Sequence, residues 1–326
     1  MTANGHVLAF CGGIGGAKLA LGLARVLPRG ALTVAVNTGD DFEHLGLCIS
    51  PDLDTVTYAL AGIDNLETGW GRRDETWGFM QALAEVGGET WFKLGDRDLA
   101  LHVERTRRLR NGETLSAITA DIARRFGIES RILPMSDHRV CTMVRTRDGT
   151  LPFQRYFVEQ QCAPAVAGFA FEGAAVAAPH PAILEALSDR RLRAVVICPS
   201  NPYISIDPIL ALPSLRAALK RAAAPVIAVS PIIGGRAVKG PTAKMMQELG
   251  LSVDVRTVAA HYGDILNGYV IDAADDRFAN ELDLPLLVTP TLMRSLADRE
   301  ALARAVLDFA DRLRIAPTRR ASGGGR

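Results

Sequence analysis

The N-terminal segment constrains the fold most strongly, because it joins a short apolar run, a glycine cluster and a helical pattern. His6–Cys11 is apolar, and it breaks directly into the glycine cluster Gly12–Gly16. Apolar residues then recur at helical spacing over Lys18–Leu27, and Leu32–Val36 is a second apolar run. This strand–helix–strand succession of about 30 residues predicts a parallel sheet.

The second half of the chain carries the same alternation of apolar runs and helical patterns. We expect strands over Arg193–Cys198, Pro225–Val229, Val253–Val258, Gly268–Ile271 and Pro285–Val288, a helix over Ile209–Ala222 and a closing amphipathic helix over Arg294–Ile315.

The two halves are separated by a long insertion with its own helical and hairpin signals. We expect helices over Thr76–Val86 and Leu115–Phe126, and a hairpin of Arg139–Arg145 with Leu151–Val158 around Asp148-Gly149. The predicted fold class is α/β, a Rossmann-like, mostly parallel sheet with helices on both faces and a large mixed α/β insertion. We expect one domain over residues 1–317, with a core at about 5–40 and 181–317, an inserted lid or substrate subdomain at about 41–180, and a disordered basic tail at 318–326.

Composition excludes several classes of protein. The 37 basic and 36 acidic residues leave a net charge of +1, which argues against a global nucleic-acid or membrane-surface binder. No apolar run reaches the ~18 residues that a spanning helix needs, and the N-terminus lacks a signal-peptide pattern. The five scattered cysteines form no CxxC pair, which argues against a disulfide framework or a cysteine zinc site. We therefore expect a cytoplasmic protein.

The glycine cluster Gly12–Gly16 stands between a strand and a helix, where backbone N–H groups can bind phosphate. It matches neither common fingerprint. A dinucleotide motif needs glycine where Lys18 stands and an acid where Asn37 stands, while a P-loop needs glycine at Ala17 and Ser or Thr at Leu19. We favour phosphate binding over the alternative of a tight turn without a ligand, because so many glycines are costly in backbone entropy.

An acidic cluster follows the second strand, at the edge of the sheet where ligands bind in doubly wound folds. Asp40, Asp41, Glu43, Asp52 and Asp54 fall within 15 residues. Such carboxylates repel one another unless a cation compensates them, and oxygen ligands suit Mg²⁺ bound with phosphate. The alternative is ordinary solvated loop charge.

Further polar segments are weaker candidates. Lys93–Asp98 packs charges of both signs around a glycine, which suggests a functional site. The alternative interpretation of this segment is a salt-bridged surface loop. Two loops each follow a predicted strand and are candidates for a binding site: Pro199–Pro202 and Ser230–Gly235. The alternative interpretation of each loop is an ordinary turn. Four arginines follow in the next helical segment, where we favour a solvated helix face over a phosphate clamp: Arg105, Arg107, Arg108 and Arg110. We expect two histidines, His138 and His261, to be structural.

Taken together, these motifs make the chain resemble the 2-phospho-L-lactate transferase family, over about residues 6–290 and in the same order. The matching segments are GGIGGAK at 12–18, NTGDD at 37–41, SPDLDT at 50–55, ETWGFM at 75–80, KLGDRDLA at 93–100, LPMSD at 133–137, PSNP at 199–202 and SPIIGG at 230–235. The loop GGIGGAK departs from the GGTGTPK of many archaeal members.

The resemblance implies a transferase of coenzyme factor 420 biosynthesis. In this reaction, a GDP-linked hydroxy acid donates its phospholactyl, phosphoenolpyruvyl or 3-phosphoglyceryl unit to the ribityl hydroxyl of the deazaflavin FO, and GMP leaves. The resemblance also implies a homodimer. It assigns Mg²⁺ to Asp40 and Asp54, FO to Asp54 and Lys93, and the guanosine diphosphate to Gly12, Gly13, Gly15, Gly16, Ser200, Asn201, Ser230 and Gly234.

Several points stay open at the level of sequence. The residues do not decide among the three donor acids. Asp54 and Asp52 are both candidates to accept the proton of the attacking hydroxyl. Trp70, Trp77 and Trp91 are candidates to wall the deazaflavin pocket, with plain core packing as the alternative. A non-catalytic nucleotide-binding regulatory protein is the alternative function, and an NAD-dependent dehydrogenase is disfavoured by the failed dinucleotide motif.

Overall fold

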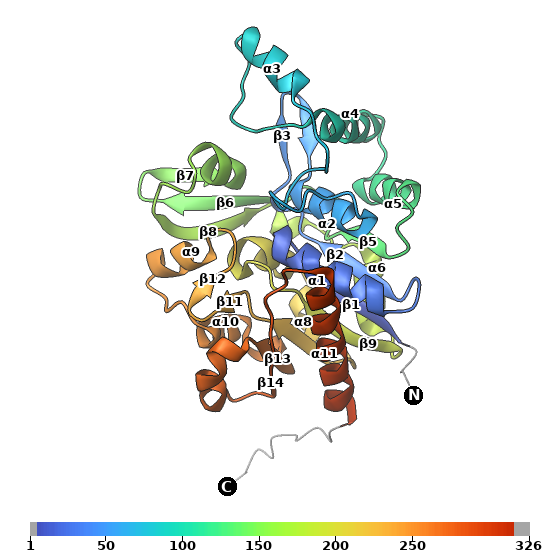
Figure 1. The fold of residues 1–326 in the computed structure, drawn as a ribbon, viewed down its shortest axis with the longest axis vertical. Helices are drawn as coiled ribbons and strands as arrows, with labels where there is room; N and C mark the ends of the chain where they lie inside the picture. The colour runs from blue at the N-terminus through green and yellow to red at the C-terminus, as the bar shows by residue number, and fades with distance from the viewer. Residues whose placement is uncertain (1–4, 316–326) are drawn as a thin grey trace.

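The computed structural model describes residues 5–315, which are organised around a seven-stranded sheet (Figure 1). The strands lie in the order β14-β13-β10-β9-β1-β2-β5, and every neighbouring pair is parallel. They are β1 (His6–Cys11), β2 (Leu32–Val36), β5 (Arg131–Pro134), β9 (Leu192–Ile197), β10 (Val226–Val229), β13 (Gly268–Ile271) and β14 (Leu286–Val288). The predicted α/β fold with a parallel sheet is confirmed.

Strand β1 lies inside the sheet between β9 and β2, and its alternating side chains enter two separate cores. Val7, Ala9 and Cys11 belong to one core, and Leu8 and Phe10 to the other. Helices therefore cover both faces. The first core receives α1 (Gly13–Val26), α2 (Pro51–Ala61) and α11 (Leu296–Ile315), and the second receives α6 (Pro181–Ser188), α7 (Asp207–Leu210), α8 (Leu215–Arg221), α9 (Thr242–Glu248) and α10 (Val255–Tyr262).

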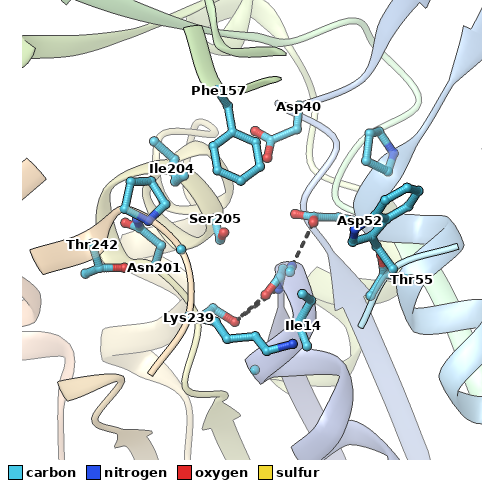
Figure 2. Close-up of a pocket in the computed structure, with 18 of the residues that line it drawn as sticks. Ile14, Asp40, Asp52, Thr55, Phe157, Asn201, Ile204, Ser205, Lys239 and Thr242 are labelled. Atoms are coloured by element: carbon cyan, nitrogen blue, oxygen red, sulfur yellow. Dashed lines mark hydrogen bonds between the residues drawn. The ribbon is translucent and has the colours of Figure 1, made fainter. Parts of the chain in front are cut away.

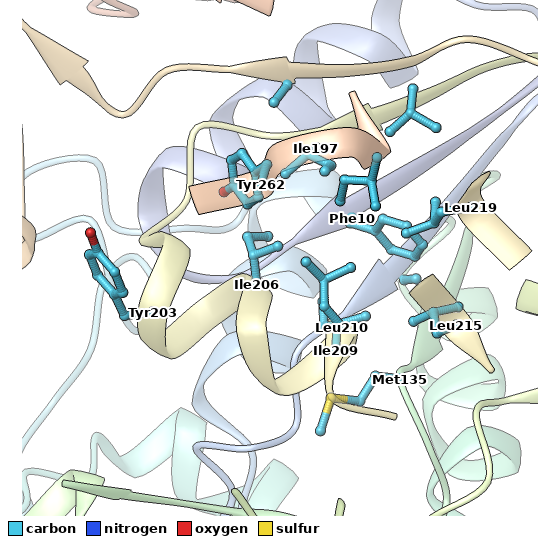
Figure 3. Packing of buried hydrophobic residues seen from close by; sticks show 14 of the residues in the cluster. Phe10, Met135, Ile197, Tyr203, Ile206, Ile209, Leu210, Leu215, Leu219 and Tyr262 are labelled. Atoms are coloured by element: carbon cyan, nitrogen blue, oxygen red, sulfur yellow. The ribbon is translucent and has the colours of Figure 1, made fainter. Parts of the chain in front are cut away.

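Figure 3 shows the second core, where Phe10 of β1 and Ile197 of β9 pack with Ile206, Tyr262 and Leu215. All five side chains are fully buried. This packing fixes the carboxyl ends of β1 and β9, which are neighbours in the sheet although their sequences are far apart.

The predicted insertion forms a hairpin, three helices and a small sheet that stand on one end of the main sheet (Figure 1). One of its segments, β5, pairs with β2 and so belongs to the main sheet. Helix α2 also packs on α1, so the core takes elements from within residues 41–180. The other elements of this region are β3 (Phe42–His44), β4 (Leu47–Ile49), α3 (Gly78–Glu85), α4 (Asp96–Arg110), α5 (Leu115–Arg125), β6 (Cys141–Thr146), β7 (Gly149–Pro152) and β8 (Val166–Glu172).

Some local predictions were wrong. Val253–Val258 is no strand, because the Asp254 carboxylate accepts the N–H groups of Arg256 and Thr257 and caps helix α10. The helix expected over Ile209–Ala222 is interrupted between α7 and α8.

Other boundaries shift by a few residues. The helix after the glycine cluster begins at Gly13, earlier than the predicted Lys18. The second hairpin arm ends at Pro152, and a π-helical turn over Arg155–Glu159 follows it. The remaining elements are the two-stranded β11 (Ile232–Ile233) and β12 (Arg236–Ala237), a π-helical turn over Pro202–Ile206, and 3₁₀ turns over Ala174–Val176, Gly263–Ile265 and Ala273–Glu281.

Within residues 5–315, no helix combines the length and the apolar character that crossing a bilayer requires. The tail predicted at 318–326 lies outside the described residues.

Candidate functional site

A cavity of about 610 Å³ opens where β1 and β9 end, which is the point where the order of strands along the chain reverses. Doubly wound sheets bind their ligands at such a switch point. Gly16 and Gly234 do not line this cavity, but the other site residues expected from the sequence do. These are Gly12, Gly13, Gly15, Asp40, Asp52, Asp54, Lys93, Ser200, Asn201 and Ser230.

The glycine cluster forms the first turn of α1 and lies against the loop that follows β9. Gly12 is the N-cap in an extended conformation, and its N–H donates to Ser200 Oγ at 3.2 Å, while Ser200 Oγ donates to the Gly12 carbonyl at 2.8 Å. Gly13 has φ +63°, the left-handed conformation that favours glycine, and its N–H donates to Asp52 Oδ1 at 2.7 Å. The helix N-terminus therefore faces the cavity with a carboxylate already beside it.

Two of the glycines are required by close packing. A Cβ on Gly15 would lie 2.3 Å from the carbonyl oxygen of Pro199, and one on Gly16 would lie 2.5 Å from Ser200 Oγ. Neither glycine has a positive φ, so it is contact and not backbone conformation that excludes a side chain at these positions. The cluster thus holds α1 against the β9 loop and leaves its backbone at the cavity wall.

Two buried aspartates and the half-buried Asp41 lie near this helix terminus. Figure 2 shows the Asp40 and Asp52 carboxylates pointing into the cavity. Burial and the nearby charge of Asp52 raise the pKa of Asp40 well above its usual range. Burial also raises the pKa of Asp52 to about 6, although Asn37 Nδ2 donates to Asp52 at 3.0 Å and the Gly13 N–H donates as well. Asp41 is held by Ser50 Oγ, which donates to it at 2.7 Å.

Asp40 is a candidate ligand for a divalent cation. Its Oδ1 is buried and has no hydrogen-bond partner among the residues that the structure describes. A buried, unpartnered carboxylate oxygen is costly unless a cation compensates it, and oxygen ligands suit Mg²⁺.

Asp54 has a different environment, because a buried arginine neutralises it. Both guanidinium nitrogens of Arg105 donate to the Asp54 carboxylate, one of them to Oδ2 at 3.1 Å. Arg105 is only 3% exposed, so the predicted solvated face was wrong for this residue. Arg107 and Arg110 do lie on an exposed face of α4.

A histidine connects Asp54 to a second acid on α4. His102 Nδ1 lies 3.7 Å from Asp54 Oδ2, and His102 Nε2 lies 3.5 Å from Asp98 Oδ2. Tyr58 OH donates to Asp98 Oδ1. Within the described part of the chain, Asp54, Asp98 and His102 are three metal-ligand side chains that come within 4.8 Å of one another, and Asp40 is not in this group.

The roles of His102 and Arg105 were missed from the sequence. Asp98, His102 and Arg105 are spaced i, i+4 and i+7, so they share one face of α4. A polar stripe at that spacing, flanked by the apolar Leu101, is a signal that could have indicated a buried polar face.

The outer wall of the cavity is aromatic. Trp70 and Trp91 line it, as does Phe157, whereas Trp77 does not. Trp77 packs edge-on against Trp70, with 6.4 Å between the ring centroids. Arg155 lies over the Trp91 ring, 4.4 Å from its centroid, and holds this tryptophan in place.

Gly234, which the resemblance gave to the nucleotide, lies away from the cavity in the turn between β11 and β12. It has φ +56°, and its N–H donates to Asp275 Oδ2 at 2.8 Å. The preceding Ser230 and Ile233 do reach the cavity wall.

Comparison with known proteins agrees with this geometry. The family model described as 2-phospho-L-lactate transferase CofD matches residues 7–283. A phosphoenolpyruvate transferase of Kitasatospora aureofaciens is 40% identical over 319 residues, which cover 95% of this chain and 99% of that protein. A 2-phospho-L-lactate transferase of Methanosarcina mazei is 40% identical over 304 residues, which cover 92% and 99%.

A solved structure supports the fold alone. A member of the UPF0052 family from Bacillus halodurans superposes with a TM-score of 0.62 at 14% identity, covering 93% of this chain and 98% of that one. The family model and the two transferases span nearly all of the described residues, including both sides of the cavity. The chain therefore belongs to the 2-phospho-L-lactate transferase family.

Proposed function

We propose that this protein transfers a phospho-hydroxyacid unit from a GDP-linked donor to the ribityl hydroxyl of the deazaflavin FO and releases GMP. The observation that carries the proposal is one cavity in which a helix N-terminus and buried carboxylates face each other. A diphosphate needs the first of these features, and phosphoryl transfer with a divalent cation needs the second.

The nucleotide would lie along the wall made by the sheet core. The N-terminus of α1 carries a partial positive charge that favours the diphosphate. Ser200 and Asn201 after β9 and Ser230 after β10 offer hydrogen-bonding groups on the same wall. Both loops follow parallel strands, so their ends meet at one edge.

Mg²⁺ would be held by Asp40, with Asp54 as the second carboxylate. When bound there, the cation would neutralise the charge of the phosphoryl oxygens. Burial raises the pKa of Asp54, and the charge of Arg105 opposes this rise and holds the carboxylate at a fixed position beside the cavity.

FO would occupy the side of the cavity that the insertion builds. Trp91 and Phe157 offer aromatic surface for a tricyclic ring, and Lys93 and Asp54 lie on the same wall. In the transfer step the ribityl oxygen forms a bond to the phosphorus that carries the acid, and the bond from that phosphorus to the GMP oxygen breaks. The hydroxyl proton passes to Asp52, whose carboxylate points into the cavity.

The test is a transfer assay with purified protein, Mg²⁺, FO and each GDP-linked acid in turn, with the products identified by mass. We expect one of the phospholactyl, phosphoenolpyruvyl or 3-phosphoglyceryl products together with GMP, and loss of both in EDTA. Asp40→Asn should abolish turnover in folded protein. GDP binding without transfer from any donor would overturn the proposal and favour a nucleotide-binding regulatory protein.

We also propose that the protein acts as a homodimer, which light scattering of the purified chain would test by giving about twice the 35.0 kDa chain mass.

A further inference from the structure

A second cavity of about 320 Å³ lies beside the first, between α1 and the loop over residues 62–73. We call it the basic pocket. The two cavities adjoin each other, and we call the residues that line both of them the partition. The residues that line both are Ile14, Lys18, Thr55, Trp70, Gly71 and Lys239.

Helix packing places Lys18 on this partition and Arg299 in the adjoining wall of the basic pocket. Ile14, Lys18 and Leu21 follow one another at i, i+4 and i+7, so one face of α1 forms the pocket wall. Helix α11 packs so closely on α1 that a Cβ on Gly22 would lie 2.2 Å from the carbonyl oxygen of Arg299. This contact seats Arg299 in the pocket wall beside Lys18, and Arg299 is only 7% exposed.

The charges of the basic pocket are not balanced. Its lining holds one acid, Asp64, against five cations, and none of the five forms a salt bridge within residues 5–315. The five cations are Lys18, Arg73, Lys239, Arg294 and Arg299.

The two most enclosed cations also lack full hydrogen bonding. Lys18 Nζ donates to the Met293 carbonyl at 3.1 Å, and Arg299 Nε is buried with no hydrogen-bond partner in the described chain. Burial lowers the pKa of Lys18, and the nearby charges of Arg299 and Lys239 lower it further. Buried charges without partners are costly, so this arrangement favours an anionic ligand.

The position of the pocket indicates which anion it receives. Lys18 follows Gly13 by five residues, a rise of about 7.5 Å along α1 from the proposed diphosphate site. The proposed donor carries a carboxylate a few bonds beyond its second phosphate, so a diphosphate at the N-terminus of α1 leaves this carboxylate as the anionic group still to be bound. A guanidinium beside an ammonium binds a carboxylate well.

We propose that the basic pocket receives the carboxylate end of the donor's hydroxy acid, with Lys18 and Arg299 as the residues that bind it. The inference rests on the proposed function, and it names the part of the cavity that selects the donor by its acid. The carboxylate is common to all three candidate donors, so the pocket explains recognition of the class.

The test compares Lys18→Met and Arg299→Met with two matched controls on the same helices. Arg25→Met on α1 and Arg304→Met on α11 remove an equal charge outside both cavities. The measurements are kcat/KM for the GDP-linked donor and calorimetric affinity for GDP alone. Loss of a charged hydrogen bond should lower kcat/KM for the donor by about tenfold or more, with GDP affinity within about twofold of wild type. Both controls should behave as wild type.

Equal kcat/KM for the donor in Lys18→Met and wild type would overturn the inference, as would an equal loss of GDP affinity. Lys18 is half-buried at the cavity wall, so its variant keeps the test valid if Arg299→Met fails to fold. Lys18→Arg should retain most activity, because the positive charge remains.

A second measurement separates this inference from the proposed function. Free phosphoenolpyruvate, 2-phospho-L-lactate and 3-phosphoglycerate are titrated into wild type and Lys18→Met, with sulfate as the carboxylate-free probe. If no donor supports transfer, weaker binding of these acids to Lys18→Met but unchanged sulfate binding would still support the pocket. Equal binding of the acids to both proteins would overturn it.

Discussion

The two walls of the large cavity are built in different ways. The wall from the sheet core is backbone held by close packing, as where Gly15 meets the Pro199 carbonyl. The wall from the insertion is made of buried ionised side chains, such as Asp54 and Arg105, which come from different helices. The first wall is fixed by local sequence and strand order. The second depends on ion pairs between distant segments, so substitutions should affect the two walls unequally.

The largest effect is expected where the insertion wall loses its buried cation. Arg105→Leu leaves Asp54 buried and unpaired, which should lower the free energy of unfolding by about 3–5 kcal/mol. Urea unfolding measures this loss. The control is Arg107→Leu on the same helix, whose pair with Glu104 is exposed, so its loss should change the free energy of unfolding little. Equal losses in the two variants would contradict the difference between buried and exposed pairs.

The next effect concerns pH. The pKa of Asp52 is about 6 in the folded protein against an ordinary value of 3.8, so the folded state binds more protons between these values. The free energy of unfolding of the metal-free protein should therefore fall as pH rises from about 4 to 6. The total contribution of Asp52 to this fall is about 3 kcal/mol.

Asp52→Asn should flatten that fall and raise stability at pH 7.5, while the exposed Asp148→Asn should not. Burial also raises the pKa of Asp40 and Asp41, so some pH dependence remains in the Asp52 variant. Chemical unfolding at a series of pH values in EDTA checks both variants. A wild-type stability that rises through this range would contradict the assignment.

A smaller effect is expected in the core wall. Gly15→Ala brings a Cβ against the Pro199 carbonyl, which should cost about 1–3 kcal/mol of stability. Gly78→Ala is the matched control, because Gly78 also lies in the first turn of a helix but has ordinary contact distances. Thermal unfolding of the two variants should differ, and similar melting temperatures would show that the close packing is relaxed easily.

The smallest effect is expected at the rim of the insertion wall. Lys93→Ala should weaken FO affinity by several-fold with little change in stability, since the Lys93 side chain lies at the cavity edge. Quenching of tryptophan fluorescence by FO measures the affinity, because Trp91 lines the same wall. Trp77→Phe is the control, since Trp77 lies outside the cavity. An FO affinity unchanged in Lys93→Ala would remove this residue from the site.

The sequence was sufficient for the core wall because its signals are local. The apolar run at His6–Cys11, the glycine cluster and the second strand fixed the parallel sheet, and strand order then placed Ser200 beside Gly12. It failed at Val253–Val258, where the Asp254 cap outweighed a β-branched pattern.

The sequence was insufficient for the insertion wall because its contacts are distant. The Arg105–Asp54 pair joins residues 51 positions apart, and no local pattern indicates it. The wall of the basic pocket beside Lys18 includes Arg299 from the last helix, and no local sequence pattern indicates this neighbour either.

Crossed titration of GDP and FO tests the central claim, that the two walls bind different molecules. GDP and FO are each titrated into wild type, Gly15→Ala and Lys93→Ala. We predict that Gly15→Ala weakens GDP binding and leaves FO affinity near wild type, whereas Lys93→Ala weakens FO binding and leaves GDP affinity unchanged. Loss of both affinities in each folded variant, or of neither, would contradict this division of the cavity.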